Sequence, residues 1–274
     1  MTGASERGRR ALQGLWSRAR ALPRRYTLAL AAGCAVPVLA LVILLLWPID
    51  PAPFTSFGAS GELFDRNGRL LYAFLNGEEQ WLFPRELDAI SPYLVKATIA
   101  TEDQRFRSHH GVDAMAVGRA IIQNARGLGV RSGASTLTMQ VVKQNGPPSR
   151  TITGKAWQAI QALRLERYVS KDEILRTYLN TAPYGLNLLG CEAAARRYFG
   201  KPAKELTLSE AALLAGLPKS PVGLMPLKNP ERALARRNYV LARMRDEGFI
   251  DAGDYERASK QPLDVEWHAF PQSA

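Results

Sequence analysis

The longest uncharged stretch of the chain lies near its N-terminus and is almost entirely apolar. Residues 27–47 contain no charged side chain. At 1.5 Å per residue, a helix of this length crosses a hydrocarbon core of about 30 Å. Pro37 would kink such a helix without preventing it. We therefore predict one transmembrane helix. The alternative, a cleaved signal peptide, is disfavoured because the run is long and no small-residue cleavage site follows it.

The segment after this stretch changes character twice. Residues 48–60 begin with three prolines within six positions, which predicts an extended linker without helix. The apolar runs that follow flank the pair Asn67-Gly68. This pair favours a hairpin, because both residues accept positive φ. Residues 62–74 are therefore expected to form two short strands.

Beyond residue 90 the apolar positions follow helical spacing. Ser91 suits an N-cap and Pro92 the first position of a helix that runs to Glu102. The pattern predicts a mainly helical domain with a small β element at its start. Further helices are expected at residues 114–125 and 136–143, after the capping sequences Ser170–Glu173 and Thr207–Glu210, and at residues 231–247.

Composition and charge agree with a folded, membrane-attached protein. The 274 residues are 46% hydrophobic and 22% charged, with a formal net charge of +11. Residues 1–26 hold seven arginines against one acid, so more than half of the excess lies in this tail. The positive-inside rule then predicts a cytoplasmic tail at residues 1–26 and an external remainder. Topology accounts for the tail, so no nucleic-acid partner is expected.

The densest polar cluster spans residues 101–111. Glu102 and Asp103 end an apolar helix, where acids oppose the helix dipole. Such local violations concentrate at functional sites. The alternative is a solvated acidic pair bridged to nearby arginines. A metal role for His109 and His110 is disfavoured, because no further ligands have suitable spacing.

Two later segments offer groups for an anion or a sugar. In residues 132–143, hydroxyls, an amide and Lys143 together suit a phosphate or sugar, whereas an ordinary N-cap is the alternative. In residues 150–166, Lys155 and Gln158 share one helix face, and Arg150 adds a second charge. The alternative for this segment is an amphipathic helix with a solvated basic face.

Taken in order, these segments resemble the motifs of the peptidoglycan glycosyltransferases (glycosyltransferase family 51), the polymerase domain of class A penicillin-binding proteins. The resemblance implies a mainly α, lysozyme-like helical domain at residues 61–255, with a small N-terminal β-hairpin, one preceding transmembrane helix and a C-terminal tail at residues 256–274. The matching residues are Glu102, Asp103, Phe106, His109 and Gly111; Gly133, Ser135, Thr136, Thr138 and Gln140; Arg150, Thr151, Lys155, Glu166 and Ser170–Leu175; Tyr178–Asn180 and Tyr198–Lys201; and Glu210–Pro218.

Two positions depart from the family pattern. Gln158 stands where the family usually has a second glutamate, and Met139 where it often has glutamine. Both variants resemble the 1C-type penicillin-binding proteins. We find no S-x-x-K or K-[ST]-G sequence, so no transpeptidase activity is expected of these residues. Either the second carboxylate is dispensable, or Glu166 replaces it, or activity is low.

The resemblance implies that the domain polymerises lipid II into β-1,4 glycan strands by inverting transfer, with release of undecaprenyl diphosphate. Glu102 would be the base, Lys155 would stabilise the diphosphate, and Gln158 completes the catalytic set. No cofactor is required by the sequence, although Mg or Mn would be compatible with the reaction. The substrate-binding candidates are Asp103, Phe106, His109, Ser135, Thr136, Thr138, Gln140, Lys143, Arg150 and Asn180.

The implied location is the plasma membrane, with one span, a cytoplasmic N-terminus and an extracytoplasmic catalytic domain. The expected partners are lipid II, the nascent glycan strand and the membrane, and candidate protein partners are transpeptidases or other wall-synthesis proteins. Three alternatives remain at this point: an inactive scaffold of a wall-synthesis complex, a lytic transglycosylase or lysozyme-like hydrolase, and, weakest, a nucleic-acid binder.

Overall fold

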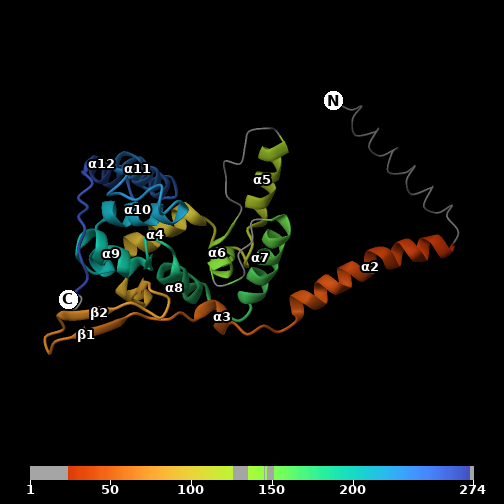
Figure 1. Ribbon diagram of the computed structural model, residues 1–274. Helices are drawn as coiled ribbons and strands as arrows, with labels where there is room; N and C mark the ends of the chain where they lie inside the picture. Colours follow the sequence, from red (N-terminus) through yellow and green to blue (C-terminus); the bar gives the residue numbers. More distant parts are fainter. Residues whose placement is uncertain (1–23, 126–134, 145, 147–150, 272–274) are drawn as a thin grey trace, which may run out of the picture. The chain divides into compact units, whose positions relative to one another are not determined.

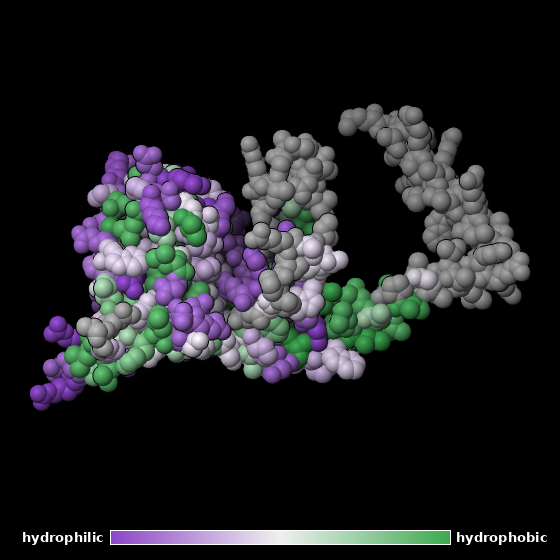
Figure 2. All heavy atoms as spheres, viewed as in Figure 1, coloured by the Kyte–Doolittle hydropathy of each residue, from purple (hydrophilic) through white to green (hydrophobic). Residues whose placement is uncertain are grey.

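The computed structural model describes residues 24–125, 135–144, 146 and 151–271 (Figure 1). Contacts between residues divide the chain into two units, residues 1–48 and 49–274. The first unit contains helix α2 (Arg24–Leu46), whose coloured part is mostly the green of hydrophobic residues (Figure 2). Its exposed apolar side chains include Val36, Val38 and Leu39. No helix within the described residues combines the length and the hydropathy that a membrane span requires.

The second unit begins with a short helix and a hairpin. Helix α3 (Ala52–Thr55) contradicts the prediction of a linker without helix. Its prolines lie at the N-terminus, where a missing N–H leaves no intrahelical bond unmade. The hairpin is confirmed: β1 (Gly61–Phe64) pairs antiparallel with β2 (Leu70–Phe74).

The hairpin turn differs from the predicted one. Gly68 has a φ of +79°, but Asn67 does not adopt positive φ. Instead, the Asp65 carboxylate accepts hydrogen bonds from the backbone N–H groups of Asn67 and Arg69, at 2.8 Å each. The aspartate side chain thus replaces part of the backbone turn. Near the other end of β2, the N–H of Ala73 donates to the carbonyl of Pro271, which ties the C-terminal segment to the hairpin.

A buried helix organises one half of the domain. Helix α10 (Leu208–Gly216) is apolar on nearly all sides and packs against α4 (Pro92–Glu102) and α11 (Pro230–Asp246). Its predicted capping box is confirmed, because Thr207 and Glu210 bond reciprocally. Ser91 occupies the N-cap position of α4, but its hydroxyl donates to the carbonyl of Leu206 instead of capping. This packing holds the C-terminus of α4, and hence Glu102, rigidly.

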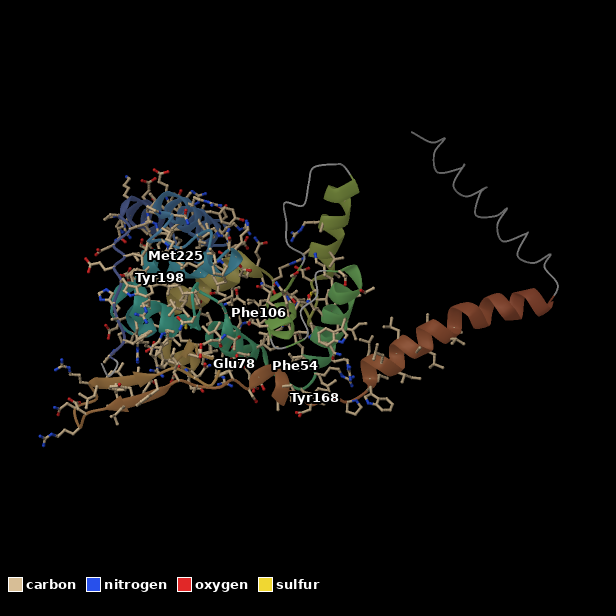
Figure 3. The ribbon with its side chains drawn as sticks, in the orientation of Figure 1. Phe54, Glu78, Phe106, Tyr168, Tyr198 and Met225 are labelled. Carbon is tan, nitrogen blue, oxygen red and sulfur yellow. The ribbon has the colours of Figure 1, made fainter. Side chains whose placement is uncertain are left out.

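The other half is built on α6 (Leu137–Gln144), which packs against α7 (Ile152–Leu165) and α8 (Lys171–Thr181). Thr136 caps α6 by accepting from the N–H of Met139 at 3.1 Å. Ser170 caps α8 as predicted. Phe106 and Tyr198 are fully buried inside the domain (Figure 3).

The described chain is mainly helical, which confirms that part of the predicted fold class. A parallel pair of two-residue strands adds a minor sheet. Helix α12 (Ala252–Lys260) was not predicted from the sequence, and it crosses residue 255, where the catalytic domain was expected to end. The remaining elements are β3 (Trp81–Leu82), η1 (Leu87–Ala89), α5 (Ala114–Ala125), β4 (Leu188–Leu189), α9 (Cys191–Phe199), η2 (Ala203–Glu205), η3 (Leu217–Lys219) and α12 (Ala252–Lys260).

Candidate active site

A cleft of about 550 Å³ opens beside the C-terminus of α4. One side, which we call the motif wall, comes from the start of α5, from α6 and from α7. The other side, which we call the α11 wall, comes from η3 and α11. Glu102 lies between them. The lining residues are Thr101, Glu102, Asp103, Gln104, Asp113, Ala116, Arg119, Ser135, Thr136, Met139, Gln140, Lys143 and Gln158, with Lys219, Arg236, Tyr239 and Arg243 on the α11 wall.

Glu102 is held by one residue from each wall. The Gln140 amide nitrogen donates to Glu102 Oε2 at 2.8 Å. The Arg236 guanidinium lies 3.8 Å from Glu102 Oε1, and the two side chains are only 11% and 15% exposed, respectively. A carboxylate in this position is oriented by both walls and still reaches the cleft, as a general base must.

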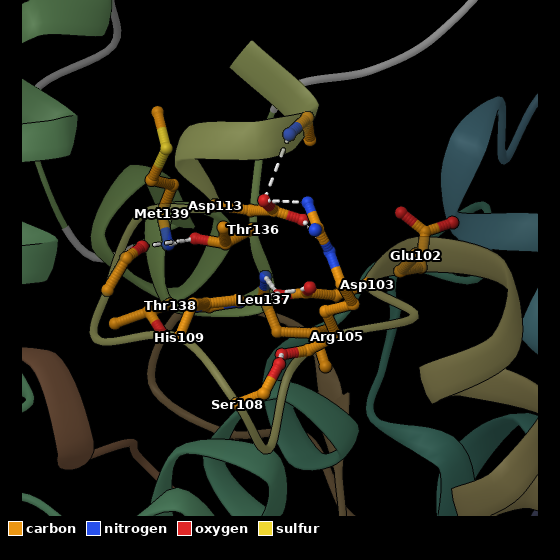
Figure 4. Close-up of polar contacts among 12 residues, drawn as sticks. Glu102, Asp103, Arg105, Ser108, His109, Asp113, Thr136, Leu137, Thr138 and Met139 are labelled. Carbon is orange, nitrogen blue, oxygen red and sulfur yellow. Dashed lines mark hydrogen bonds and ion pairs between the residues drawn. The ribbon is translucent and has the colours of Figure 1, made fainter. Parts of the chain in front are cut away.

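Asp103 fastens the loop after α4 to the start of α6. Its carboxylate accepts from the N–H of Leu137 at 3.0 Å and pairs with His109 Nε2 at 2.9 Å (Figure 4). A carboxylate at the N-terminus of α6 also interacts favourably with the helix dipole. The Thr136 hydroxyl donates to the carbonyl of Gly111 at 2.6 Å. These bonds hold the first motif segment (residues 101–111) against the start of α6, which belongs to the second motif segment (residues 132–143).

Gly111 permits a close approach that no other residue allows. Its φ is +82°, and a Cβ at this position would lie 2.6 Å from the backbone of Ala162 on α7. Helix α7, which belongs to the third motif segment (residues 150–166), therefore packs directly on the first segment at Gly111. This contact brings α7, and with it Gln158, to the motif wall.

A second buried carboxylate supports α5. Asp113 accepts from Arg105 Nε at 3.0 Å and from the N–H of Ala116 at 2.9 Å (Figure 4). Burial alone would raise the pKa of Asp113, but the Arg105 and Ala116 hydrogen bonds outweigh it and the pKa is lowered. This pair was not predicted from the sequence. An acid one residue before a helix, eight residues after an arginine, was the available signal.

The charge of the Glu102 carboxylate affects the pKa of two buried tyrosines. Burial raises the pKa of Tyr178 and of Tyr184 well above the usual value, and the Glu102 carboxylate adds to both shifts. The Arg236 guanidinium opposes the shift of Tyr178. Burial lowers the pKa of Arg236 itself, although the Glu102 carboxylate works against that change. Glu102 and Arg236 are therefore the principal charges in this part of the site.

The structure separates the predicted site residues into two groups. Seven of them line the cleft: Glu102, Asp103, Ser135, Thr136, Gln140, Lys143 and Gln158. Four lie buried behind that lining and bond to protein. Phe106 packs against the Lys171 ammonium, His109 pairs with Asp103, Thr138 donates to Glu166, and Asn180 bonds the backbone of Arg85.

Two further predicted residues, Lys155 and Arg150, belong to neither group. Lys155 is exposed on α7 and is not among the described lining residues. Arg150 lies outside the described residues. The alternative in which Glu166 supplies the second carboxylate is wrong, because Glu166 is 3% exposed and its carboxylate is paired with Lys171 at 2.8 Å, away from the cleft.

The α11 wall was missed almost entirely. Arg236, Tyr239 and Arg243 recur at spacings of three and four, so they share one face of α11. The sequence contained this spacing, but it is equally typical of a solvated basic helix. Lys219 follows the buried helix α10 and faces the same cleft.

The described lining of the cleft includes two aspartates that are candidate metal ligands, Asp103 and Asp113. Both carboxylates accept hydrogen bonds from protein donors: that of Asp103 from the N–H of Leu137, and that of Asp113 from Arg105. Among the residues that the structure describes, no group of three or more His, Cys, Asp or Glu side chains is placed to hold a metal ion. That no cofactor is required, and that Mg or Mn is compatible with the reaction, both stay predictions.

Comparison with known proteins places the chain in a family. The family model described as Transglycosylase matches residues 67–245. The chain is 40% identical over 218 residues to penicillin-binding protein 1A of Escherichia coli (strain K12), covering 79% of this chain and 24% of that protein. It is 38% identical over 248 residues to penicillin-binding protein 1C of the same organism, covering 88% and 32%.

A crystal structure of penicillin-binding protein 1A from Haemophilus influenzae matches 78% of this chain and 22% of its own, with a TM-score of 0.46 and 28% identity. The chain thus spans about a quarter to a third of the length of these relatives. The identities do not separate the 1A from the 1C type, so the predicted likeness to the 1C type stays a prediction. The chain belongs to the transglycosylase family, as its motifs indicated.

Proposed function

We propose that this domain is a peptidoglycan glycosyltransferase that polymerises lipid II. The observation that carries the proposal is the placement of Glu102, a carboxylate held between Gln140 and Arg236 in a cleft whose described lining also includes cationic side chains from both walls. One base beside several cations suits a reaction that takes one proton and releases a diphosphate.

The proposed step is a single inverting displacement. The acceptor 4-hydroxyl oxygen attacks C1 of the donor sugar, and its proton passes to Glu102. The bond between C1 and the diphosphate oxygen breaks, and the diphosphate leaves with the electron pair. Because the donor carries an α-linked diphosphate, one displacement gives the β-1,4 linkage. A second, nucleophilic carboxylate is not needed for this stereochemistry.

The cations of the cleft would stabilise the leaving group. Lys143 on the motif wall can approach a developing diphosphate charge, and Arg236 adds a positive charge beside Glu102 at the reacting centre. Ser135 and Gln158 would add neutral hydrogen bonds to the donor. In this proposal Phe106, His109, Thr138 and Asn180 act as supports, since protein surrounds them. Lys155 keeps its predicted role for a substrate that extends beyond the described lining.

We also propose that residues 27–47 anchor the chain in the plasma membrane, with residues 1–26 cytoplasmic and the catalytic domain outside. The absence of charge in this stretch and the arginines before it support the proposal. Substrates with undecaprenyl tails would then lie in the same membrane. Glycan strands and transpeptidases are the proposed downstream partners.

The test uses the full chain in detergent with purified lipid II. We expect glycan strands that a muramidase digests, together with released undecaprenyl diphosphate. Addition of EDTA tests the dependence on a divalent cation. Digestion of finished sacculi without strand synthesis would favour the hydrolase alternative. Binding of lipid II or of wall-synthesis proteins without either reaction would favour the scaffold alternative.

A further inference from the structure

Helix α11 presents two contrasting faces. Its buried positions pack against α4 and α10, so the helix is fixed to the one that carries Glu102. Its cleft face carries Arg236, Tyr239 and Arg243. Tyr239 is 50% exposed, which distinguishes it from the fully buried tyrosines behind Glu102. An aromatic ring that is half exposed and faces a polar cleft offers apolar surface that a ligand can cover.

Arg236 restrains this ring. The guanidinium carbon lies 4.8 Å from the centre of the Tyr239 ring, and the Arg236 side chain is 11% exposed. A cation over an aromatic face holds both groups in place. The same guanidinium lies 3.8 Å from the Glu102 carboxylate. Tyr239, Arg236 and Glu102 therefore form a contiguous row from the α11 wall to the base.

The charges near Tyr239 indicate what the ring would meet. Lys219 and Arg243 line the same wall. Arg243 is paired with Glu247 at 3.1 Å, whereas Lys219 forms no ion pair within the part of the chain that the structure describes. An aromatic ring between cations suits a sugar that carries an anionic group. The apolar C–H face of a pyranose covers the ring, while the phosphate or carboxylate meets the cations.

We propose that Tyr239 is a sugar-contacting residue that binds the acceptor on the α11 wall and aligns its 4-hydroxyl with Glu102. The inference rests on the proposed function. The donor diphosphate is assigned to the motif wall, with Lys143, so the acceptor sugar occupies the opposite side of Glu102. Tyr239 lies on that side, one side chain away from the base.

Kinetics of the full chain with lipid II test the role of the ring. We expect Tyr239→Ala to raise KM for lipid II about 3- to 10-fold, in line with the loss of one aromatic contact, while kcat changes less than about threefold. Tyr239→Trp restores a ring and should recover most of the affinity. Tyr168→Ala is the matched control, because Tyr168 is 47% exposed and lies outside the described lining.

The pH profile separates direct contact from an indirect effect. If Tyr239 acted only by holding Arg236 against Glu102, Tyr239→Ala would shift the pH dependence of kcat. Direct contact predicts an unchanged profile with a raised KM. An altered profile with an unchanged KM would overturn the proposal.

A binding measurement needs no turnover. Saturation-transfer NMR with a GlcNAc–MurNAc tetrasaccharide that lacks diphosphate should show sugar contacts with the wild type and with Tyr168→Ala, but weakened ones with Tyr239→Ala. Equal transfer in all three proteins would overturn the inference. So would a loss of association of Tyr239→Ala with phosphatidylglycerol vesicles while sugar contacts persist, since the ring would then contact lipid.

The two proposals fail in distinguishable ways. If the wild type makes no strands from lipid II, the proposed function fails and the sugar role falls with it. If the wild type makes strands but Tyr239→Ala behaves like Tyr168→Ala, only the role of Tyr239 fails.

Discussion

The two walls of the cleft are built by different means. The motif wall joins segments that are far apart in the chain: Asp103 bonds Leu137 and Glu102 bonds Gln140, 34 and 38 residues away. The α11 wall owes its shape to helix packing, and its cleft-facing side chains make few bonds across the cleft. Loss of a buried link of the motif wall, such as Asp103, should therefore distort or unfold the domain, whereas substitutions on the α11 wall should alter binding and leave the fold intact.

The largest effect is expected where the motif wall is fastened. Asp103→Ala removes a 6% exposed carboxylate and leaves the N–H of Leu137 and the His109 ring without their partner. The free energy of unfolding should fall by about 2–6 kcal/mol, because each of two buried groups left without its partner costs about 1–3 kcal/mol. Urea unfolding of the full chain measures it. Arg243→Ala on the α11 wall is the control, and equal stability of the two variants would erase the contrast between the walls.

Arg236 is the one α11 residue that touches the base. Arg236→Met removes the cation 3.8 Å from Glu102 and should lower kcat/KM about 10- to 100-fold, the range of one charge-assisted contact. The melting temperature should change little in comparison, since α11 keeps its packing. Initial rates with lipid II measure the effect. A rate within twofold of wild type would show that Arg236 contributes nothing to the reaction.

Lys143 and Lys219 offer a symmetric comparison, one exposed lysine on each wall. Each substitution by glutamine should raise KM for lipid II by roughly threefold to tenfold, and each should flatten the dependence of KM on salt. Kinetics at several salt concentrations measure this. If only Lys143→Gln had an effect, the α11 wall would not face an anionic part of the substrate.

The smallest effect concerns a region outside both walls. Glu62 accepts from Arg85 at 3.0 Å and from Arg196 at 2.7 Å. Burial alone would raise its pKa, but these partners outweigh burial and hold the pKa below the usual 4.5. Since the folded-state pKa is lowered, Glu62 stabilises the fold above pH 4.5 and loses this contribution as the pH falls further.

Glu62→Gln should therefore lower the melting temperature at pH 7 and flatten its decline below pH 4.5. Thermal unfolding across this pH range checks it. Glycan synthesis at pH 7 should persist, because Glu62 lies outside the described lining. A decline as steep as that of wild type would mean that other carboxylates dominate the acid response.

The elements that could be predicted from the sequence are those that depend on patterns of neighbouring residues. The hairpin, the capping of α8 and α10, and the helix that ends at Glu102 follow from turn, cap and periodicity rules. The motif match also placed Glu102 and Gln140 in one site, which the structure bears out with a direct hydrogen bond. Thr138 and Asn180 were predicted to bind substrate, but spacing alone does not say whether a polar side chain faces a cleft or a neighbouring helix.

The cleft-facing residues of α11 could not be predicted from the sequence, for a physical reason. Arg236 and Arg237 are adjacent in the sequence, yet the first faces the cleft and the second is 1% exposed and bonds the carbonyls of Ser259 and Gln261. The side on which α10 and α4 pack decides between them, and that is a tertiary property. Arg105 and Asp113 likewise pair only because the intervening loop folds back.

The central claim is that Glu102 is the base of a polymerising transferase. The most direct test compares lipid II polymerisation by wild type, Glu102→Gln and Glu78→Gln, where Glu78 is an exposed glutamate outside the described lining. We expect Glu102→Gln to lose about 10²- to 10⁴-fold in rate with an unchanged melting temperature, and Glu78→Gln to match wild type. Strand synthesis by Glu102→Gln at the wild-type rate would contradict the account.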